Sequence, residues 1–285
     1  MASKLEKTPI IDLHPIIEGE GTLMGSPAIM IRVSGCNLSC MFDNSICDTA
    51  YSSFCPEKGK YTLADVDKMI KDHPFISTIS LSGGEPCLYP ELIVHLKKAY
   101  PNHYLLVETN GTVMLQKEIY KYVDLFSISP KLSGSTPTKE KCEANGMEWN
   151  NKMRAHDILR QNLDPLATMI AYSKDFQLKY VISEEADLKE AEIQINTLMI
   201  IDYLRDLPKD KVTDYLTKAK ETQGEYIPED FKTKVVLGRI WLMPSGITRE
   251  HLDAKRQWLM EKCIEKGFNY SDRLQIVAYG NKREA

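Results

Sequence analysis

The sequence predicts an α/β fold: a full or partial (β/α) barrel of mainly parallel strands with two insertions. Runs of β-branched residues alternate with helical patterns, which is typical of parallel strands joined by right-handed crossover helices. Six or seven such units favour a barrel over a flat, doubly wound sheet. Polar motifs follow four consecutive strands, and parallel strands would bring them to one rim, where active sites lie in such folds.

The predicted strands are segments rich in β-branched and other apolar residues. They are Ala28–Ser34, Ile76–Ser82, Tyr104–Glu108, Asp124–Ser129, Gln177–Ser183, Val235–Met243 and Arg273–Ala278. The predicted helices between them are Leu63–Lys71, Pro90–Ala99, Leu115–Tyr122, Ala186–Tyr203 and Arg249–Lys266. Thr62 is placed to cap the first helix, with Asp65 in its first turn.

Two polar stretches interrupt this alternation. Leu132–Met169 is rich in Lys, Glu and Asn, and Asp206–Lys234 is strongly charged. The sequence contains no repeat, no low-complexity segment and no convincing linker. We therefore expect residues 1–285 to form a single domain, with insertions near 132–169 and 206–234.

The composition is that of an ordinary globular protein, because 43% of the 285 residues are apolar and 27% are charged. A net charge of −4 argues against nucleic acid as a partner. Seven cysteines, three of them clustered, do not suggest the disulfide framework of a short secreted chain. We find no secretion signal and no apolar run of about 18 residues, so we expect a cytoplasmic protein without a membrane partner.

Three cysteines, Cys36, Cys40 and Cys47, lie within twelve residues just after the first predicted strand. Three thiolates can bind three irons of a 4Fe–4S cluster and leave the fourth iron open for chemistry. Two alternatives stay open on this pattern. One is a zinc site, which normally needs a fourth protein ligand such as Cys55, and the other is a set of buried, unreactive thiols.

Three further motifs have both a functional and a structural interpretation. Ser82–Pro86 (Ser-Gly-Gly-Glu-Pro) lets the backbone approach a ligand closely, or forms a tight strand–helix turn. Glu108–Gly111 (Glu-Thr-Asn-Gly) offers a carboxylate and an amide for ribose hydroxyls or an amino group, or forms a turn. Glu18–Gly21 (Glu-Gly-Glu-Gly) offers two carboxylates, or is a mobile loop.

Arg32 is unusual because it lies inside an apolar predicted strand. Burying an unpaired guanidinium is costly. Arg32 therefore either binds a carboxylate of a ligand or takes part in a structural salt bridge. Lys131, which follows Ser129 and Pro130, could be an ordinary surface lysine.

Together these motifs resemble the radical S-adenosylmethionine superfamily, in which a cysteine loop follows the first strand and Gly-Gly-Glu-Pro follows the second. More narrowly, the chain resembles the 7-carboxy-7-deazaguanine synthases. The resemblance runs nearly end to end, broken by the two insertions. It is carried by Glu18–Gly21 with Gly25, Pro27-Ala28, Arg32–Leu38, Cys47-Asp48-Thr49, Ser82–Pro86, Glu108–Thr112, Ser129-Pro130-Lys131, Leu178–Val181, Leu242-Met243-Pro244 and Arg273-Leu274-Gln275.

This resemblance implies a partial barrel of the radical S-adenosylmethionine type and a lyase reaction. In that family 6-carboxy-5,6,7,8-tetrahydropterin contracts to 7-carboxy-7-deazaguanine with release of ammonia, in queuosine-type 7-deazapurine biosynthesis. The cofactors implied are a 4Fe–4S cluster, catalytic S-adenosylmethionine and Mg²⁺. An electron donor such as flavodoxin or ferredoxin and a homodimer are also expected from the family.

The resemblance also assigns roles to individual residues. The cluster ligands would be Cys36, Cys40 and Cys47, and Thr49 matches the magnesium position. The S-adenosylmethionine site would be lined by Ile46, Cys47, Asp48, Gly84, Glu108, Ser129, Pro130 and Lys131. The substrate would be contacted by Ile17, Glu18, Gly19, Glu20, Arg32 and Ser82, with Arg32 holding the pterin carboxylate.

Three features depart from the family pattern. The second gap of the cysteine loop, Met41 to Ile46, has six residues where two are usual. Glu18 stands where glutamine is usual, and the chain ends with Tyr279–Arg283 and two more residues instead of a histidine–proline substrate segment. Two other functions also stay open: an activase that installs a glycyl radical in a partner protein, and a zinc module that binds nucleic acid.

Overall fold

The computed structural model describes residues 4–42, 45–280 and 282–283 of the chain. An eight-stranded sheet lies at its centre, with the strand order β1-β2-β5-β6-β7-β8-β9-β10. β1 pairs antiparallel with β2, and every later pair in this sheet is parallel. The strands are β1 (Ile10–Ile17), β2 (Pro27–Val33), β3 (Met41–Phe42), β4 (Ser45–Ile46), β5 (Thr78–Gly83), β6 (Tyr104–Thr109), β7 (Leu125–Ile128), β8 (Phe176–Ile182), β9 (Ile240–Pro244) and β10 (Asn269–Tyr270).

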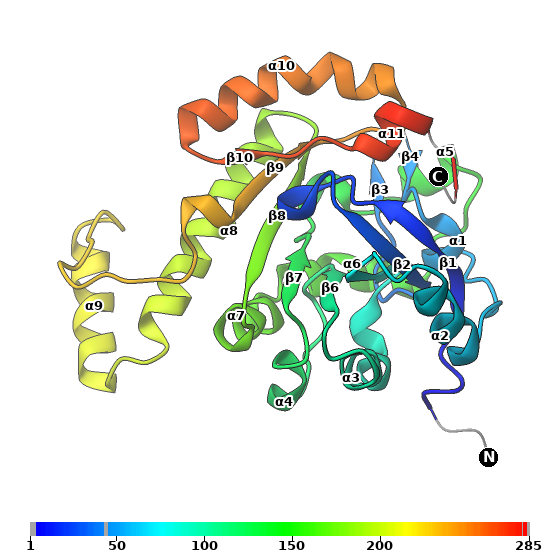
Figure 1. Cartoon of the computed structure of the whole chain (residues 1–285). Coiled ribbons are helices and arrows are strands. Elements are labelled where there is room, and N and C mark those ends of the chain that lie inside the picture. The colour runs from blue at the N-terminus through cyan, green and yellow to red at the C-terminus, as the bar shows by residue number, and fades with distance from the viewer. Residues whose placement is uncertain (1–3, 43–44, 281, 284–285) are drawn as a thin grey trace.

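Helices surround the outer face of this curved sheet (Figure 1). Because each parallel strand pairs with the next one in sequence, right-handed crossovers place their helices on the same face. The α-helices are α1 (Ala50–Ser53), α2 (Leu63–Asp72), α3 (Pro90–Ala99), α4 (Lys117–Tyr120), α5 (Lys139–Ala144), α6 (Asn151–Gln161), α7 (Asp164–Tyr172), α8 (Glu185–Leu204), α9 (Lys209–Glu221), α10 (Arg249–Lys266) and α11 (Leu274–Tyr279). Among the described residues, no helix is both long and apolar enough to cross a bilayer.

The two edges of the sheet meet at one end of the molecule. The Leu274 N–H donates to the carbonyl of Gly19, 3.1 Å away, and the Gly21 N–H donates to Ser271 Oγ, 2.8 Å away. These bonds join the segment after β1 to the segment after β10. The result is a partial barrel, as the sequence predicted, and its seam is closed only by loops in the described part of the chain.

The core lies between the sheet and the outer helices. Ile79 and Leu81 of β5 are buried, and so are Leu92, Ile93 and Leu96 of α3. The predicted cap of α2 is confirmed: the Asp65 N–H donates to Thr62 Oγ1, and the Thr62 N–H donates to Asp65 Oδ2. This reciprocal capping box stabilises a helix end by about 1 kcal/mol.

The prediction of individual elements needs three corrections. Arg273–Ala278 is not a strand, because most of it forms α11, and the last strand is β10. Residues 235–239 of the predicted strand Val235–Met243 lie outside β9, and a 3₁₀ turn at Leu237–Arg239 precedes that strand. The sequence reading also missed β1, an edge strand that contains Pro15.

The two polar stretches contain helices of different kinds. The first contains α5, α6 and most of α7, and α7 packs into the core through Leu166, Met169 and Ile170. The second contains α9, which stands away from the sheet (Figure 1). Tyr215 of α9 packs edge-on against Tyr203 of α8, with ring centroids 5.8 Å apart.

Candidate active site

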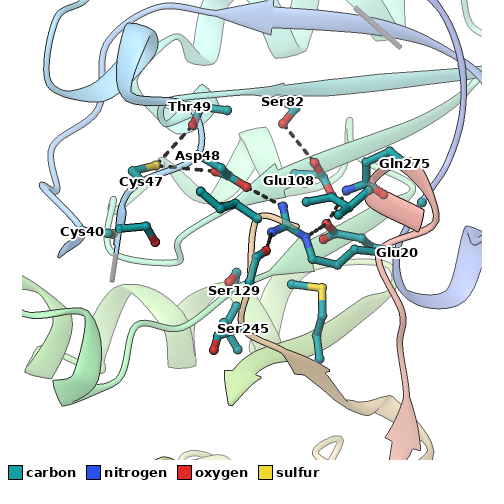
Figure 2. A pocket seen from close by; sticks show the side chains of 18 of the residues that line it. Glu20, Cys40, Cys47, Asp48, Thr49, Ser82, Glu108, Ser129, Ser245 and Gln275 are labelled. Carbon is teal, nitrogen blue, oxygen red and sulfur yellow. Dashed lines mark hydrogen bonds and ion pairs between the residues drawn. The ribbon is translucent and has the colours of Figure 1, made fainter. Parts of the chain in front are cut away.

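A cavity of about 950 Å³ opens inside the curve of the sheet, where the carboxyl ends of the strands meet. This volume is at the upper end of the range for small-molecule and cofactor sites. Every predicted site residue except Pro130 lines it: Ile17, Glu18, Gly19, Glu20, Arg32, Cys36, Cys40, Ile46, Cys47, Asp48, Thr49, Ser82, Gly84, Glu108, Ser129 and Lys131. Figure 2 shows Cys40 and Cys47 on one side of the cavity, with Glu20, Glu108 and Gln275 on the other.

The cysteine loop connects β2 to the small antiparallel pair β3–β4 and then to α1. Cys36, Cys40 and Cys47 are all free thiols, and the Cys47 N–H donates to the Cys40 carbonyl at 3.0 Å. The extra length of the loop therefore forms a short hairpin that returns Cys47 to Cys40. Two residues of this predicted motif, Asp43 and Asn44, lie outside the described residues.

Burial raises the pKa of the Cys36 thiol to about 11, and it also raises the pKa values of Cys40 and Cys47. The negative charges of Glu85 and Cys47 raise the pKa of Cys36 further, and those of Cys47 and Cys36 raise the pKa of Cys40. The three sites therefore favour neutral thiols unless a positive charge is bound beside them. A bound metal supplies such a charge and displaces the protons.

Among the described residues, no three His, Cys, Asp or Glu side chains converge closely enough to hold one metal ion. A 4Fe–4S cluster does not need such convergence, because each cysteine binds a different iron. Three free thiols spread along one cavity wall therefore fit a cluster better than a single zinc ion.

Gly84 brings the end of β5 against the cysteine loop. A Cβ atom at Gly84 would lie 2.1 Å from the Gly35 carbonyl oxygen, so no larger residue fits this contact. The carboxylate of fully buried Glu85 accepts N–H bonds from Cys87 and Asn110, at 2.9 and 2.8 Å. The Gly-Gly-Glu-Pro motif thus fixes the cysteine loop and the end of β6 in one rigid unit.

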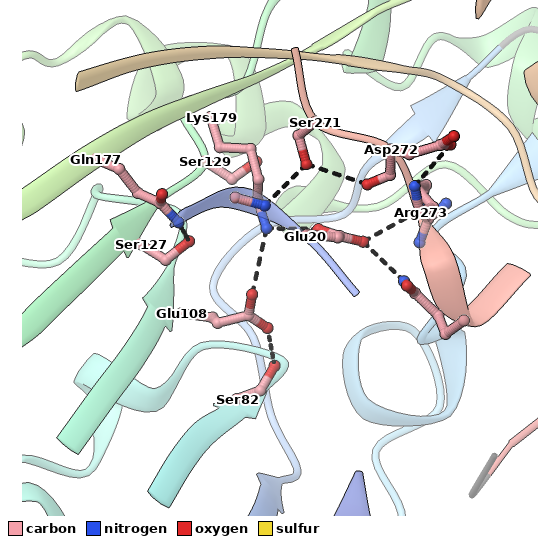
Figure 3. Close-up of polar contacts among 12 residues, drawn as sticks. Glu20, Ser82, Glu108, Ser127, Ser129, Gln177, Lys179, Ser271, Asp272 and Arg273 are labelled. Carbon is pink, nitrogen blue, oxygen red and sulfur yellow. Dashed lines mark hydrogen bonds and ion pairs between the residues drawn. The ribbon is translucent and has the colours of Figure 1, made fainter. Parts of the chain in front are cut away.

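A chain of polar contacts crosses the opposite side of the cavity (Figure 3). Lys179 Nζ lies 2.5 Å from Glu20 Oε2 and 3.2 Å from Glu108 Oε1, and the Ser82 hydroxyl donates to Glu108 Oε2 at 2.9 Å. Burial alone would lower the pKa of Lys179, but the two carboxylates raise it above its usual range. Lys179 is therefore a buried cation, and it holds two predicted site residues in place.

Arg273 extends this chain toward the cysteine loop. Its Nε lies 3.1 Å from Glu20 Oε1, and its Nη2 forms an ion pair with Asp48, next to Cys47. Burial would raise the pKa of Glu20, but Lys179 and Arg273 hold that pKa well below its usual range. The Gln275 amide also donates to Glu20, at 2.8 Å. Glu20 is therefore an anion fixed by three side chains.

Glu18 has different surroundings from Glu20. Only 3% of Glu18 is exposed, and its Oε1 has no hydrogen-bond partner among the described residues. Burial, followed by the negative charge of Glu108, raises the pKa of Glu18 to about 7. The cavity therefore holds one carboxyl group that is partly protonated near neutral pH, close to the Glu20 carboxylate, which stays ionised.

Arg32 of β2 also lines the cavity, and it has an internal partner. Its Nε lies 3.0 Å from Oδ2 of buried Asp12, in an ion pair without good hydrogen-bond alignment. Arg283 contacts the other oxygen of Asp12, at 2.7 Å, and its guanidinium lies over the Tyr51 ring at 3.8 Å. The structural salt bridge considered for Arg32 is thus present, while its side chain still faces the cavity.

The other predicted site residues make local contacts. The Lys131 ammonium donates to Ser129 Oγ at 2.7 Å, and the Thr49 hydroxyl lies 3.3 Å from the Cys47 thiol. A Cβ atom at Gly19 would collide with the Gln275 side chain. Pro130 lies outside the main cavity and lines a small neighbouring pocket.

Comparison with known proteins places this architecture in a family. A profile of the radical SAM superfamily matches residues 30–176. A 7-carboxy-7-deazaguanine synthase of Halobacterium salinarum is 30% identical over 277 residues, covering 97% of this chain and 92% of the relative. The chain belongs to the radical S-adenosylmethionine superfamily and, within it, to the 7-carboxy-7-deazaguanine synthases.

One further relative carries the same name, and one solved structure has a similar fold. A 7-carboxy-7-deazaguanine synthase of Rhodopirellula baltica is 29% identical over 269 residues, covering 93% of this chain and 84% of the relative. The crystal structure of QueE from Escherichia coli covers 93% of each chain with a TM-score of 0.52 and 18% identity, which supports the fold. Membership in this superfamily implies a 4Fe–4S cluster and S-adenosylmethionine as cofactors, and it favours the cluster over the zinc site.

Sequence reasoning gave no role to several residues that shape the cavity of this synthase-family chain. Lys179 carried a usable signal, because it is a charged residue in the middle of the apolar strand β8. Asp12 lies in the strand that was missed, and Arg273 lies at the start of the segment wrongly predicted as a strand. In both cases the wrong local structure hid the residue's contacts.

Proposed function

We propose that this chain contracts 6-carboxy-5,6,7,8-tetrahydropterin to 7-carboxy-7-deazaguanine with release of ammonia, as a single catalytic domain in queuosine-type 7-deazapurine biosynthesis. The observation that carries the proposal is the set of three free thiols on the wall of a cavity whose remaining walls offer paired carboxylates and arginine. The nearly full-length match to a named synthase supports it.

We propose that Cys36, Cys40 and Cys47 hold the cluster. When bound, the cluster supplies the electron that cleaves S-adenosylmethionine to a radical able to remove a hydrogen atom from the substrate. The protein's own residues bind and orient S-adenosylmethionine and the substrate, and they exclude water from the cavity. Ile46–Asp48, Gly84, Glu108 and Ser129-Pro130-Lys131 are proposed to line the S-adenosylmethionine site, although Pro130 would act through the shape of its turn rather than by lining the cavity.

The substrate is proposed to lie against Ile17–Glu20, Arg32 and Ser82. Arg32 has five N–H donors and shares Asp12 with Arg283, so donors remain for the pterin carboxylate. Glu18, Glu20 and Ser82 offer hydrogen-bond partners for the ring nitrogens. Because Glu18 is partly protonated, it can both donate and accept a hydrogen bond, as the usual glutamine would.

Mg²⁺ is proposed to bind at the Thr49 hydroxyl. The described residues offer no cluster of carboxylates for it. Mg²⁺ in proteins usually keeps several waters and takes oxygens from a substrate, so it does not need such a cluster. Thr49 would therefore be one ligand among waters and substrate oxygens.

The remaining partners are proposed from the family alone. They are an electron donor such as flavodoxin or ferredoxin and a second copy of the chain in a homodimer. A cytoplasmic location is also proposed. The reducing interior of a cell would keep the three thiols free and protect an oxygen-sensitive cluster.

Anaerobic turnover tests the proposed function. Reconstituted protein with a reductant, S-adenosylmethionine and the carboxypterin should give a product with the mass of 7-carboxy-7-deazaguanine, while the amount of S-adenosylmethionine stays constant. Failure to convert the carboxypterin by protein with a full cluster would reject the proposal. Net consumption of S-adenosylmethionine without a small-molecule product would instead favour the activase.

A further inference from the structure

The extended part of the cysteine loop packs against a segment more than 80 residues away in sequence. This segment, the α5–α6 segment, comprises residues 132–161 and contains the 3₁₀ turn Ser133–Ser135, α5 and α6. Met41 of β3 is fully buried against Cys142 of α5, whose thiol lies 3.8 Å from Met41 Sδ and 3.4 Å from Met153 Sδ. Ile46, Phe54, Met147 and Trp149 pack around these three side chains.

This packing is separate from the main core. Met41, Cys142 and Met153 form a hydrophobic cluster of their own, while the strands and outer helices share another. On its other side the α5–α6 segment is attached to α8, because Arg160 Nη1 lies 2.7 Å from Glu190 Oε1. The segment therefore joins the cysteine loop to α8 and contributes little to the sheet.

His156 of α6 makes the most direct contact with the loop. The Ser39 N–H, between Cys36 and Cys40, donates to His156 Nδ1 at 3.1 Å. Neutral imidazole then carries its proton on Nε2, which lies 3.4 Å from Ser135 Oγ, and Ser135 in turn donates to the Leu132 carbonyl at 2.7 Å. His156 is fully buried, so this continuous chain fixes both its tautomer and its position.

Two lysines of the same segment bind the main chain on either side of Cys47. Lys141 Nζ donates to the Met41 carbonyl at 3.2 Å, and Lys152 Nζ donates to the Ser53 carbonyl at 2.5 Å. Together with His156, they fix the backbone at three points, Ser39, Met41 and Ser53. Ser39 and Met41 adjoin Cys40, and Ser53 ends α1, the helix that follows Cys47.

We propose that the α5–α6 segment is a clamp that orders the lengthened cysteine loop before the cluster binds, with His156 as the positioning residue. Residues fixed in advance do not lose conformational entropy when a ligand binds. A six-residue gap between the second and third cysteines has more freedom to lose than the usual two-residue gap. The inference rests on the proposed function only in taking Cys36, Cys40 and Cys47 as cluster ligands.

Thiol labelling of the cluster-free protein tests the clamp without any catalysis. Alkylation rates of individual cysteines would be measured by peptide mass spectrometry in wild type, His156→Leu and His156→Asn. Leucine leaves the Ser39 N–H without a partner, whereas the asparagine oxygen can replace Nδ1. Exposed Cys55 checks the reagent, and buried Cys263, in the main core, reports global unfolding in the same sample.

In His156→Leu, we expect the labelling of Cys40 relative to Cys263 to rise about tenfold, since one buried hydrogen bond no longer opposes local opening. His156→Asn should return the ratio close to wild type, and Leu198→Ala, a core change in α8, should not raise it. An unchanged ratio in His156→Leu, or a parallel rise of Cys40 and Cys263, would overturn the clamp.

Iron retention separates this inference from the proposed function. After anaerobic reconstitution, His156→Leu should lose iron to a chelator about tenfold faster than wild type, and His156→Asn should resemble wild type. Equal rates in all three proteins would contradict the clamp. If the clamp passes both tests and the wild-type cluster protein leaves the carboxypterin unchanged, the proposed function alone fails.

Discussion

Lys179 and Glu18 show how single residues set the charge of the cavity. Lys179 stays protonated between two carboxylates, and Glu18 keeps a raised pKa because it is buried beside Glu108. The polar wall therefore contains fixed ions together with one group whose charge changes near neutral pH. Each feature predicts a measurable effect on stability.

Replacing Lys179 by methionine should lower the free energy of unfolding by about 3–5 kcal/mol, because Glu20 and Glu108 lose the cation between them. Urea unfolding of the cluster-free protein measures this. The double variant Lys179→Met/Glu20→Gln should be less destabilised than the sum of the single variants, because it removes one of the unpaired charges. Strict additivity would show that the Lys179–Glu20 contact carries no coupling energy.

Glu18→Gln should stabilise the protein at alkaline pH but not at acid pH. The pKa of Glu18 is raised from its usual 4.5 to about 7 in the folded chain, so its contribution to stability falls as pH rises between these values. Unfolding free energies at about pH 8 should favour the glutamine variant by on the order of 2–3 kcal/mol, with little difference at about pH 4. A pH-independent difference would exclude this titration.

At the scale of elements, the turn after β5 holds the cysteine loop by direct backbone contact. Gly84→Ala should destabilise the protein by about 2–3 kcal/mol, because its Cβ would lie 2.1 Å from the Gly35 carbonyl oxygen. Gly238→Ala is a matched control with no atom within 4 Å, and it should change stability by less than about 0.5 kcal/mol. Similar thermal unfolding of both variants would argue against this close contact.

The loop itself predicts which thiols bind iron. Cys47→Ala should prevent assembly of the cluster, because the β3–β4 hairpin returns Cys47 to Cys40. Cys55→Ala should keep about four irons per chain after anaerobic reconstitution. Iron and sulfide analysis measures both variants. The reverse pattern would make Cys55 the third ligand of the lengthened loop.

Prediction from sequence worked best for elements with a long and regular pattern. The helix Arg249–Lys266 was predicted with the bounds that the structure gives, and the buried parallel strands were located within a few residues. The segment Arg273–Ala278 failed because six residues with alternating apolar side chains fit a strand and a short helix equally well. β1 was missed because Pro15 and polar residues interrupt its apolar pattern, which an edge strand tolerates.

At the scale of the whole molecule, the barrel brings together residues that no local pattern connects. Glu20 follows β1, Lys179 lies in β8 and Arg273 precedes α11, yet all three meet at the seam of the barrel (Figure 3). The motifs after β2, β5, β6 and β7 could be assigned to one rim from strand order alone. The contacts across the seam could not be predicted from strand order, because they depend on how far the sheet curves.

The central claim is that three cysteines at the mouth of a partial barrel hold a cluster with one iron open to S-adenosylmethionine. The electron paramagnetic resonance spectrum of the reduced, oxygen-free protein, recorded with and without S-adenosylmethionine, tests it most directly. We expect the signal of a reduced 4Fe–4S cluster that changes when S-adenosylmethionine is added, since the open iron gains ligands. A missing cluster signal, or one that S-adenosylmethionine leaves unchanged, would contradict the claim.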